Sequence, residues 1–202
     1  NSEPSRSGDC NTPNFTNCDL PPAGDTAGEG GQMSSMVVVN NGYIYNIGGC
    51  VVASGTCGSN MSGNVSYAAL NSSGQMIAPS TCPHTTYGLW CVDSTNRING
   101  TTGLGAAGIT VFNNMIYVAG GTNSGTWQSN IYRVLLNADG SLVGPWQFES
   151  FTSSGLSGTA DDARGYMYMF ARANPASAGT NPGNLYMLGG CSGTGGIGCS
   201  TY

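Results

Sequence analysis

The stretch NNMIYVAGG, residues 113–121, is a short apolar run that ends in two glycines. The chain repeats this pattern as NNGYIYNIGG at residues 40–49 and as PGNLYMLGG at residues 182–190. In all three copies a tyrosine stands four residues before the second glycine. Aromatic and β-branched residues without a helical period predict a β-strand. The same strand is therefore written three times, at intervals of 72 and 69 residues.

A second segment also repeats. NVSYAALNSSGQMIAP begins at Asn64 and NIYRVLLNADGSLVGPW begins at Asn130. Four positions match at a constant spacing of 66 residues: Asn64 with Asn130, Asn71 with Asn137, Gly74 with Gly140, and Pro79 with Pro145. NSSG and NADG predict hairpin turns, because Asn and Gly tolerate a positive φ. Each segment therefore reads as strand, turn and strand.

A further strand precedes each double-glycine strand, in MSSMVVVNN, AAGITVFNN and ARGYMYMFARAN. One repeat then contains four strands, which is the composition of a β-propeller blade. A repetitive β-sandwich or solenoid is the alternative. The double glycine favours the propeller, since glycine lets neighbouring blades approach closely.

The pattern resembles kelch-type β-propeller repeats, as in extracellular bacterial kelch-like repeat proteins. YNIGG, YVAGG and YMLGG match the glycine element of that family, and Tyr132 and Trp146 match its later aromatic positions. The first repeat departs from the pattern with Ser80 in place of a tryptophan and with the insertion CPHTTYGLWC. The resemblance implies an all-β fold of kelch-like blades, each with four antiparallel strands. It assigns the blade glycines Gly48, Gly49, Gly120, Gly121, Gly189 and Gly190.

The repeats divide the chain into four parts. Residues 1–32 form a disulfide-clipped N-terminal segment, interpreted as the end of a preceding blade. Residues 33–92 form blade 1, residues 93–151 blade 2 and residues 152–202 a partial blade 3. A closed propeller needs about four to eight blades, so two and a half to three blades make an incomplete ring. The chain is then a piece of a longer protein, pairs with identical chains, or is not a propeller.

Composition excludes some partners. Of the 202 residues only 7% are charged, the net charge is −5, and the basic residues are five arginines without a lysine. A nucleic-acid partner is not expected, because it would require a basic patch. No apolar run is long enough for a membrane span.

The eight cysteines fall into neighbours seven to nine residues apart. We expect four local disulfides: Cys10–Cys18, Cys50–Cys57, Cys82–Cys91 and Cys191–Cys199. A zinc site is disfavoured, because no CxxC motif occurs and His84 is the only histidine. Disulfides indicate an oxidising compartment, so a secreted, extracellular or cell-surface location is expected.

Other residues are candidates for surface roles. Five Asn-x-Ser/Thr sequons are candidate glycosylation sites in a host that has the machinery: Asn14, Asn60, Asn64, Asn71 and Asn99. Trp90 and Trp127 are candidate ligand contacts. The alternative for each tryptophan is that it covers its own loop.

The function expected from these features is binding or adhesion. The sequence contains no recognisable catalytic set, so no enzyme activity, metal site or cofactor is expected from this chain. The partner would be a protein, a carbohydrate or copies of the chain itself. One alternative is a structural subunit that assembles into an extracellular filament or coat, and another is part of a glycan-active propeller enzyme. Fold alone does not choose between these functions.

Overall fold

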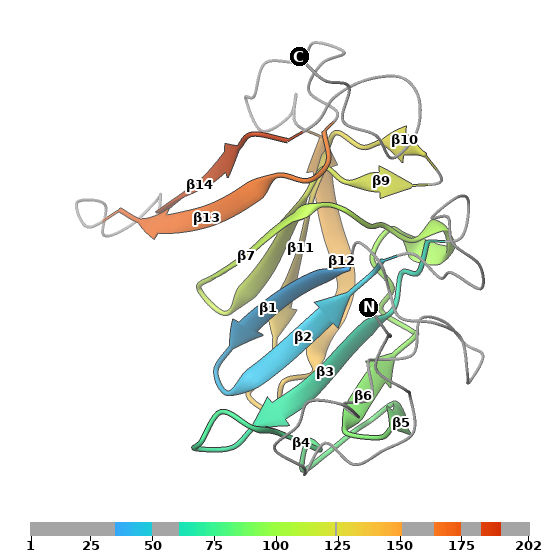
Figure 1. Ribbon diagram of the computed structural model, residues 1–202, viewed down its shortest axis with the longest axis vertical. Coiled ribbons are helices and arrows are strands. Elements are labelled where there is room, and N and C mark those ends of the chain that lie inside the picture. Colours follow the sequence, from blue (N-terminus) through green and yellow to red (C-terminus); the bar gives the residue numbers. More distant parts are fainter. Residues whose placement is uncertain (1–34, 50–60, 124, 151–163, 175–182, 191–202) are drawn as a thin grey trace, which may run out of the picture.

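The computed structural model describes residues 35–49, 61–123, 125–150, 164–174 and 183–190. Within these ranges the fold is all-β, which confirms the predicted fold class. All strand pairs are antiparallel, no sheet closes into a barrel, and one short 3₁₀ helix, η1 (Gly100–Thr102), is present. Three main sheets follow one another along the long axis of the molecule (Figure 1).

The first sheet has the order β1-β2-β3-β6-β5, with β4 also paired to β3. Its strands are β1 (Met36–Asn40), β2 (Tyr43–Ile47), β3 (Val65–Leu70), β4 (Met76–Ile77), β5 (Thr85–Tyr87) and β6 (Trp90–Asp93).

The second sheet is a four-stranded meander in chain order. It consists of β7 (Gly108–Phe112), β8 (Met115–Ala119), β11 (Asn130–Leu136) and β12 (Leu142–Ser150). A small hairpin of β9 (Thr122–Asn123) and β10 (Thr126–Trp127) leaves its end. In the third sheet β13 (Tyr168–Ala173) pairs with β14 (Gly183–Leu188). The second sheet thus has the four antiparallel strands expected of one blade.

In the first and second sheets, the turn between the first two strands follows from its asparagines. Asn41 and Gly42, between β1 and β2, have φ values of 47° and 79°. Asn113 and Asn114, between β7 and β8, have φ values of 49° and 59°. Two consecutive positive φ values define the hairpin turn that matches the natural strand twist.

The two repeated hairpins have the same backbone hydrogen bonds. Asn71 N–H donates to Gln75 O at 2.9 Å, and the equivalent Asn137 N–H donates to Ser141 O at 2.9 Å. The glycine amides also match, since Gly74 and Gly140 donate to the carbonyls of Asn71 and Asn137. The 66-residue spacing seen in the sequence is therefore a repeat in three dimensions.

The first sheet differs from the second at its outer edge. In the second sheet β12 pairs along β11, with one irregularity between Arg133 and Leu135. In the first sheet this position is divided: β4 pairs with the end of β3, and β6 pairs with its beginning. The insertion CPHTTYGLWC forms the β5–β6 hairpin and extends the sheet.

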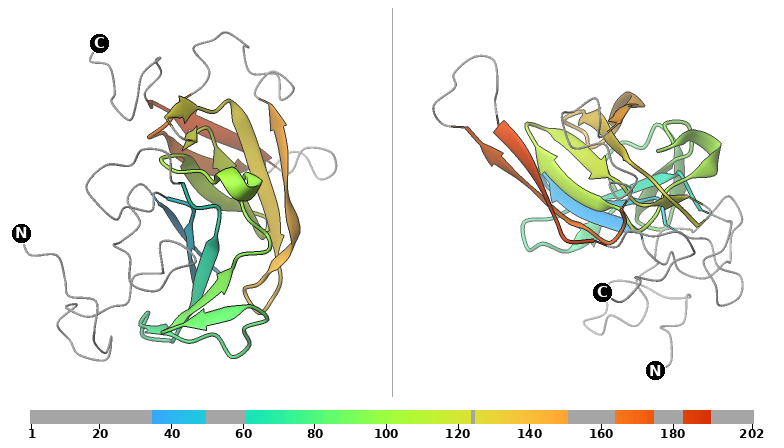
Figure 2. Two further views of the ribbon diagram at one scale, coloured as in Figure 1. Left: turned by 90° about the vertical axis from the view of Figure 1, so that its right-hand side faces the viewer. Right: turned by 90° about the horizontal axis from the view of Figure 1, so that it is seen from above.

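The hydrophobic core lies between the sheets. Its largest part joins Tyr45, Ile47 and Tyr67 of the first sheet to Ile116 and Val118 of the second. A smaller cluster joins Ala119 and Ile131 of the second sheet to methionines of the third. We call β1, β7 and β13, the first strand of each sheet, the inner strands. The closest contacts between sheets join β1 to β7 and β7 to β13. The third sheet therefore lies on the side of β7 that faces away from β1 (Figure 2).

Candidate interaction surface

The first double glycine forms the joint between the first and second sheets. Gly48 N–H donates to Asn64 O of its own sheet at 3.0 Å. Gly49 N–H donates to Leu104 O, just before β7, at 2.8 Å. A Cβ on Gly48 would overlap with the carbonyl oxygen of Leu104. The close approach and the φ of 60° therefore both require glycine.

The second joint repeats the first. Gly120 N–H donates to Asn130 O at 2.9 Å, and Gly121 N–H donates to Arg164 O, just before β13, at 2.6 Å. A Cβ on Gly120 would overlap with the carbonyl oxygen of Arg164. The same backbone geometry thus attaches the second sheet to the first and the third sheet to the second.

The third double glycine has the same backbone without the contact. Gly189 and Gly190 have φ values of 70° and 93°, close to those of the other two pairs. No atom of the described residues lies within 4 Å of a Cβ built on Gly189. Within the described ranges the amides of Gly189 and Gly190 have no hydrogen-bond partner.

The side of each sheet that faces the next sheet follows the same pattern. On the first sheet it contains Ile47, Val65 and Tyr67, which are fully buried, and on the second it contains Ala119 and Ile131, also buried. On the third sheet the same side is exposed. Arg172 and Asn184 also lie on this side and are exposed. Its large apolar members and their exposed fractions are Tyr168 (81%), Leu188 (56%), Phe170 (44%) and Tyr186 (38%). We call these four residues the terminal face.

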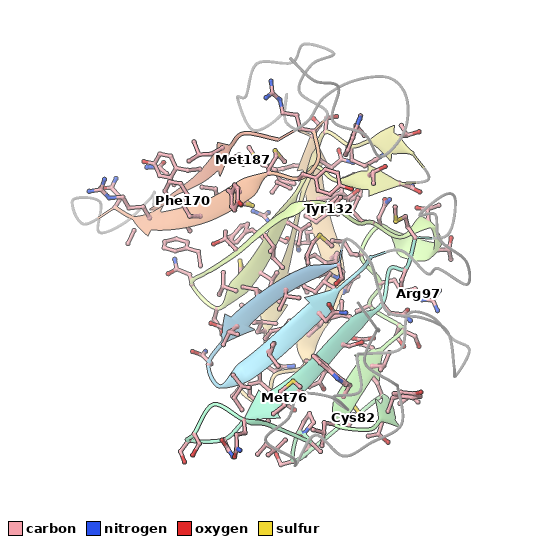
Figure 3. All side chains as sticks on the ribbon, viewed as in Figure 1. Met76, Cys82, Arg97, Tyr132, Phe170 and Met187 are labelled. Carbon is pink, nitrogen blue, oxygen red and sulfur yellow. A yellow bond between two sulfur atoms is a disulfide. The ribbon has the colours of Figure 1, made fainter. Side chains whose placement is uncertain are left out.

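The terminal face is aromatic and regular. The rings of Phe170 and Tyr186 stack with centroids 4.9 Å apart and an interplanar angle of 9°, and Tyr168 pairs with Leu188 beside them. The opposite side of the same two strands packs Met169 and Met187 against the second sheet. Phe170 and Met187 therefore mark the two sides of this sheet (Figure 3).

Sequence reasoning did not single out the terminal face. In residues 167–171, MYMFA, the side chains that alternate between the two sides of the strand are all apolar. Such a strand is typical of burial on both sides. In the structure Met169 packs against the second sheet, whereas Tyr168 and Phe170 are exposed.

A narrower apolar strip lies at the other end of the molecule. Val37 and Val39 of β1 are 53% and 54% exposed. They occupy the strand positions that Ile109 and Val111 occupy in β7, and in the second sheet those residues pack against the first. We call Val37 and Val39 the leading strip.

The disulfide Cys82–Cys91 is present, as the sequence predicts, and the other six cysteines lie outside the described residues. This disulfide closes the β5–β6 hairpin and places His84 over a buried carboxylate. His84 Nε2 lies 3.2 Å from Asp93 Oδ2. Asp93 Oδ1 also accepts hydrogen bonds from Thr95 N–H and Asn96 N–H, both at 2.8 Å. His84 and Asp93 therefore hold the connection to the second sheet in shape.

Trp90 and Trp127 are both buried and do not form an exposed ligand contact. Trp90 packs with Ala68 and Val92 on the first sheet. Trp127 lies against Gly165, where it leaves no room for a Cβ, and its indole meets the ring of Tyr166 edge-on at 6.1 Å. Packing, the alternative reading of both tryptophans, is what the structure shows.

Three sequon asparagines lie within the described residues, and Asn14 and Asn60 lie outside them. Asn64 is buried, so a glycan on its side chain would be incompatible with the folded sheet. Asn71 Nδ2 donates to Gln75 Oε1, and Asn99 Nδ2 donates to Gly103 O, both at 3.0 Å. The side-chain amides of Asn71 and Asn99 are thus used by the fold.

Buried phenols lie at the contact between the first two sheets. Tyr45 Oη donates to Gly140 O at 3.0 Å, whereas the buried Tyr67 Oη has no hydrogen-bond partner among the described residues. Burial, followed by the nearby charge of Asp139, raises the pKa of Tyr67 to about 12, and burial also raises the pKa of Tyr45. Hydrogen bonds from Ser141 lower the pKa of Asp139.

The described ranges contain neither a cluster of metal-binding side chains nor a membrane-spanning helix. No group of three or more His, Cys, Asp or Glu side chains there could hold a metal ion. No helix in that part of the chain is long and apolar enough to cross a membrane. The sequence matches no protein-family model and no curated protein.

Proposed function

We propose that this chain is an extracellular, kelch-like propeller segment that acts as a binding or adhesion module without catalysis of its own. One observation carries the proposal. The terminal face exposes Tyr168, Phe170, Tyr186 and Leu188, although Ile47 and Ala119, which hold the position of Leu188 in the two preceding sheets, are buried. A contiguous exposed apolar surface of this kind is typical of an interaction site. Aromatic rings contribute large contact areas with little loss of side-chain freedom.

The kelch-like assignment is supported by the joints. Three double glycines share one backbone conformation, at Gly48–Gly49, Gly120–Gly121 and Gly189–Gly190. Two of the three attach a sheet to its successor in the same way. The extracellular location is supported by the Cys82–Cys91 disulfide, because such bonds persist in oxidising compartments.

The test is a binding measurement with a matched pair of variants. Each fluorescently labelled variant is applied to an oligosaccharide array and to a surface that carries immobilised copies of that same variant. We expect binding to at least one of them, and its loss in Tyr168→Ser. Phe148→Ser should bind like the wild type, because Phe148 is 69% exposed but lies on β12, outside the terminal face.

Unchanged thermal melting would show that both variants are folded. Equal binding by Tyr168→Ser, or no binding by the wild type to either surface, would refute the proposal. Release of reducing sugar from a bound oligosaccharide would refute the absence of catalysis.

A further inference from the structure

We infer that the partner of the terminal face is a second copy of this chain, docked head to tail through its leading strip. This inference rests on the proposed function, because it requires the terminal face to be a contact surface. It goes further by naming the partner and the residues that the partner presents.

The template for this contact occurs twice inside the chain. In both joints the side of one sheet that carries the residue before the double glycine packs on the next sheet. The inner strand of the next sheet lies nearest to that joint. A copy docked on the terminal face would therefore meet it with β1, its own first inner strand.

Strand register identifies the matching residues. Met36, Gly108 and Tyr168 hold the same place, since each is paired with the residue that precedes a double glycine. The next residues along the three inner strands are Val37, Ile109 and Met169. Ile109 and Met169 pack against the preceding sheet, whereas Val37 is half exposed. Val37 and Val39 are thus the residues that should contact a preceding sheet.

The two surfaces are complementary in chemistry as well as in position. The terminal face consists of three aromatic rings and a leucine, and the leading strip consists of two valines. These six side chains are uncharged, and Arg172 is the charged side chain on the same side of β13 as Tyr168 and Phe170. Docking would also place the copy beside Gly189 and Gly190, as the second sheet lies beside Gly48 and Gly49. Association should therefore depend mainly on apolar burial.

Two different surfaces make a heterologous contact. Such contacts produce a ring when the rotation closes and an open fibre when it does not. A closed ring leaves no terminal face free, and a fibre leaves one free at its end. The terminal face is therefore covered in nearly every copy.

Sedimentation velocity of the full chain at increasing concentration tests the inference. The wild type should form concentration-dependent oligomers. Tyr168→Glu places a charge on the terminal face, and Val39→Glu places one on the leading strip. Each variant alone should be monomeric. An equimolar mixture should form a 1:1 dimer and nothing larger, because one intact surface of each kind remains.

Phe148→Glu is the matched control and should assemble like the wild type, since Phe148 is exposed and apolar but belongs to neither surface. A second blocking variant, Gly189→Ala, should also remove the oligomers, and its methyl group meets no atom of the residues that the structure describes. Thermal melting of every variant shows whether it is folded.

A monomeric wild type, or a mixture of Tyr168→Glu and Val39→Glu that does not dimerise, would overturn the inference. So would equal loss of assembly in Phe148→Glu. If the wild type is monomeric but Tyr168→Glu alone loses binding on the oligosaccharide array, the proposed function stands and only the head-to-tail partner is wrong.

Discussion

Replacing Gly140 with alanine measures the packing between the first two sheets, and replacing Gly74 provides the control. The two glycines occupy the same turn position in the two repeated hairpins, with φ values of 83° and 76°. They donate equivalent backbone hydrogen bonds. Their surroundings differ: a Cβ on Gly140 would lie 2.5 Å from Cδ1 of Tyr43, whereas a Cβ on Gly74 would meet no atom within 4 Å.

The expected magnitudes follow from these two surroundings. An L-residue in the left-handed region costs about 1–2 kcal/mol relative to glycine, and both variants share this cost. At Gly140 the ring of Tyr43 must also move, although it is held edge-on against Tyr67. Overpacking of this kind typically costs about 1–3 kcal/mol more. We expect Gly74→Ala to lower the free energy of unfolding by about 1–2 kcal/mol and Gly140→Ala by about 2–5 kcal/mol.

Urea unfolding followed by tryptophan fluorescence measures both values, and the difference between them isolates the contact between the sheets. Equal losses in the two variants would show that the sheets do not pack through this hairpin. The positions of the first and second sheets relative to each other would then need revision.

Four further predictions concern ionisable side chains and the joints. Tyr67→Phe should leave the free energy of unfolding unchanged or raise it by about 1 kcal/mol, whereas Tyr45→Phe should lower it by about 1–2 kcal/mol, because only Tyr45 loses a hydrogen bond. The pKa of Tyr67 is raised from 10.0 to about 12, so its contribution to stability is complete below pH 10 and is lost as the pH rises through 12. The fall of the melting temperature in this alkaline range should therefore be smaller in Tyr67→Phe than in the wild type. Asp139 has a lowered pKa, so its contribution is present above pH 3.8 and is lost as the pH falls further; Asp139→Asn should flatten that acid limb, and an unchanged limb would contradict the assignment. Gly121→Val should lower the free energy of unfolding by more than about 2 kcal/mol, because its Cβ would lie 2.7 Å from the carbonyl oxygen of Gly105. A melting temperature equal to that of the wild type would show that Gly121 does not lie in a close backbone contact.

The local features of this protein could be predicted from its sequence. The β-strands, the repeat spacing and the turns at Asn71 and Asn137 follow from properties of a few neighbouring residues. Positive φ values favour Asn and Gly, and the alternation of side chains along a strand is visible within one segment. The Cys82–Cys91 disulfide is also local, since it closes a short hairpin.

The tertiary structure decided which surfaces are covered. Tyr168 and Met169 are adjacent and both apolar, yet the first is exposed and the second packs against the second sheet. Trp90 and Asn64, candidates for surface roles by composition, are buried. Coverage of a side chain depends on sheets whose strands lie about 60 to 70 residues away along the chain. No pattern within one strand contains that information, because a strand with two apolar sides is the same sequence whether one neighbouring sheet or two lie against it.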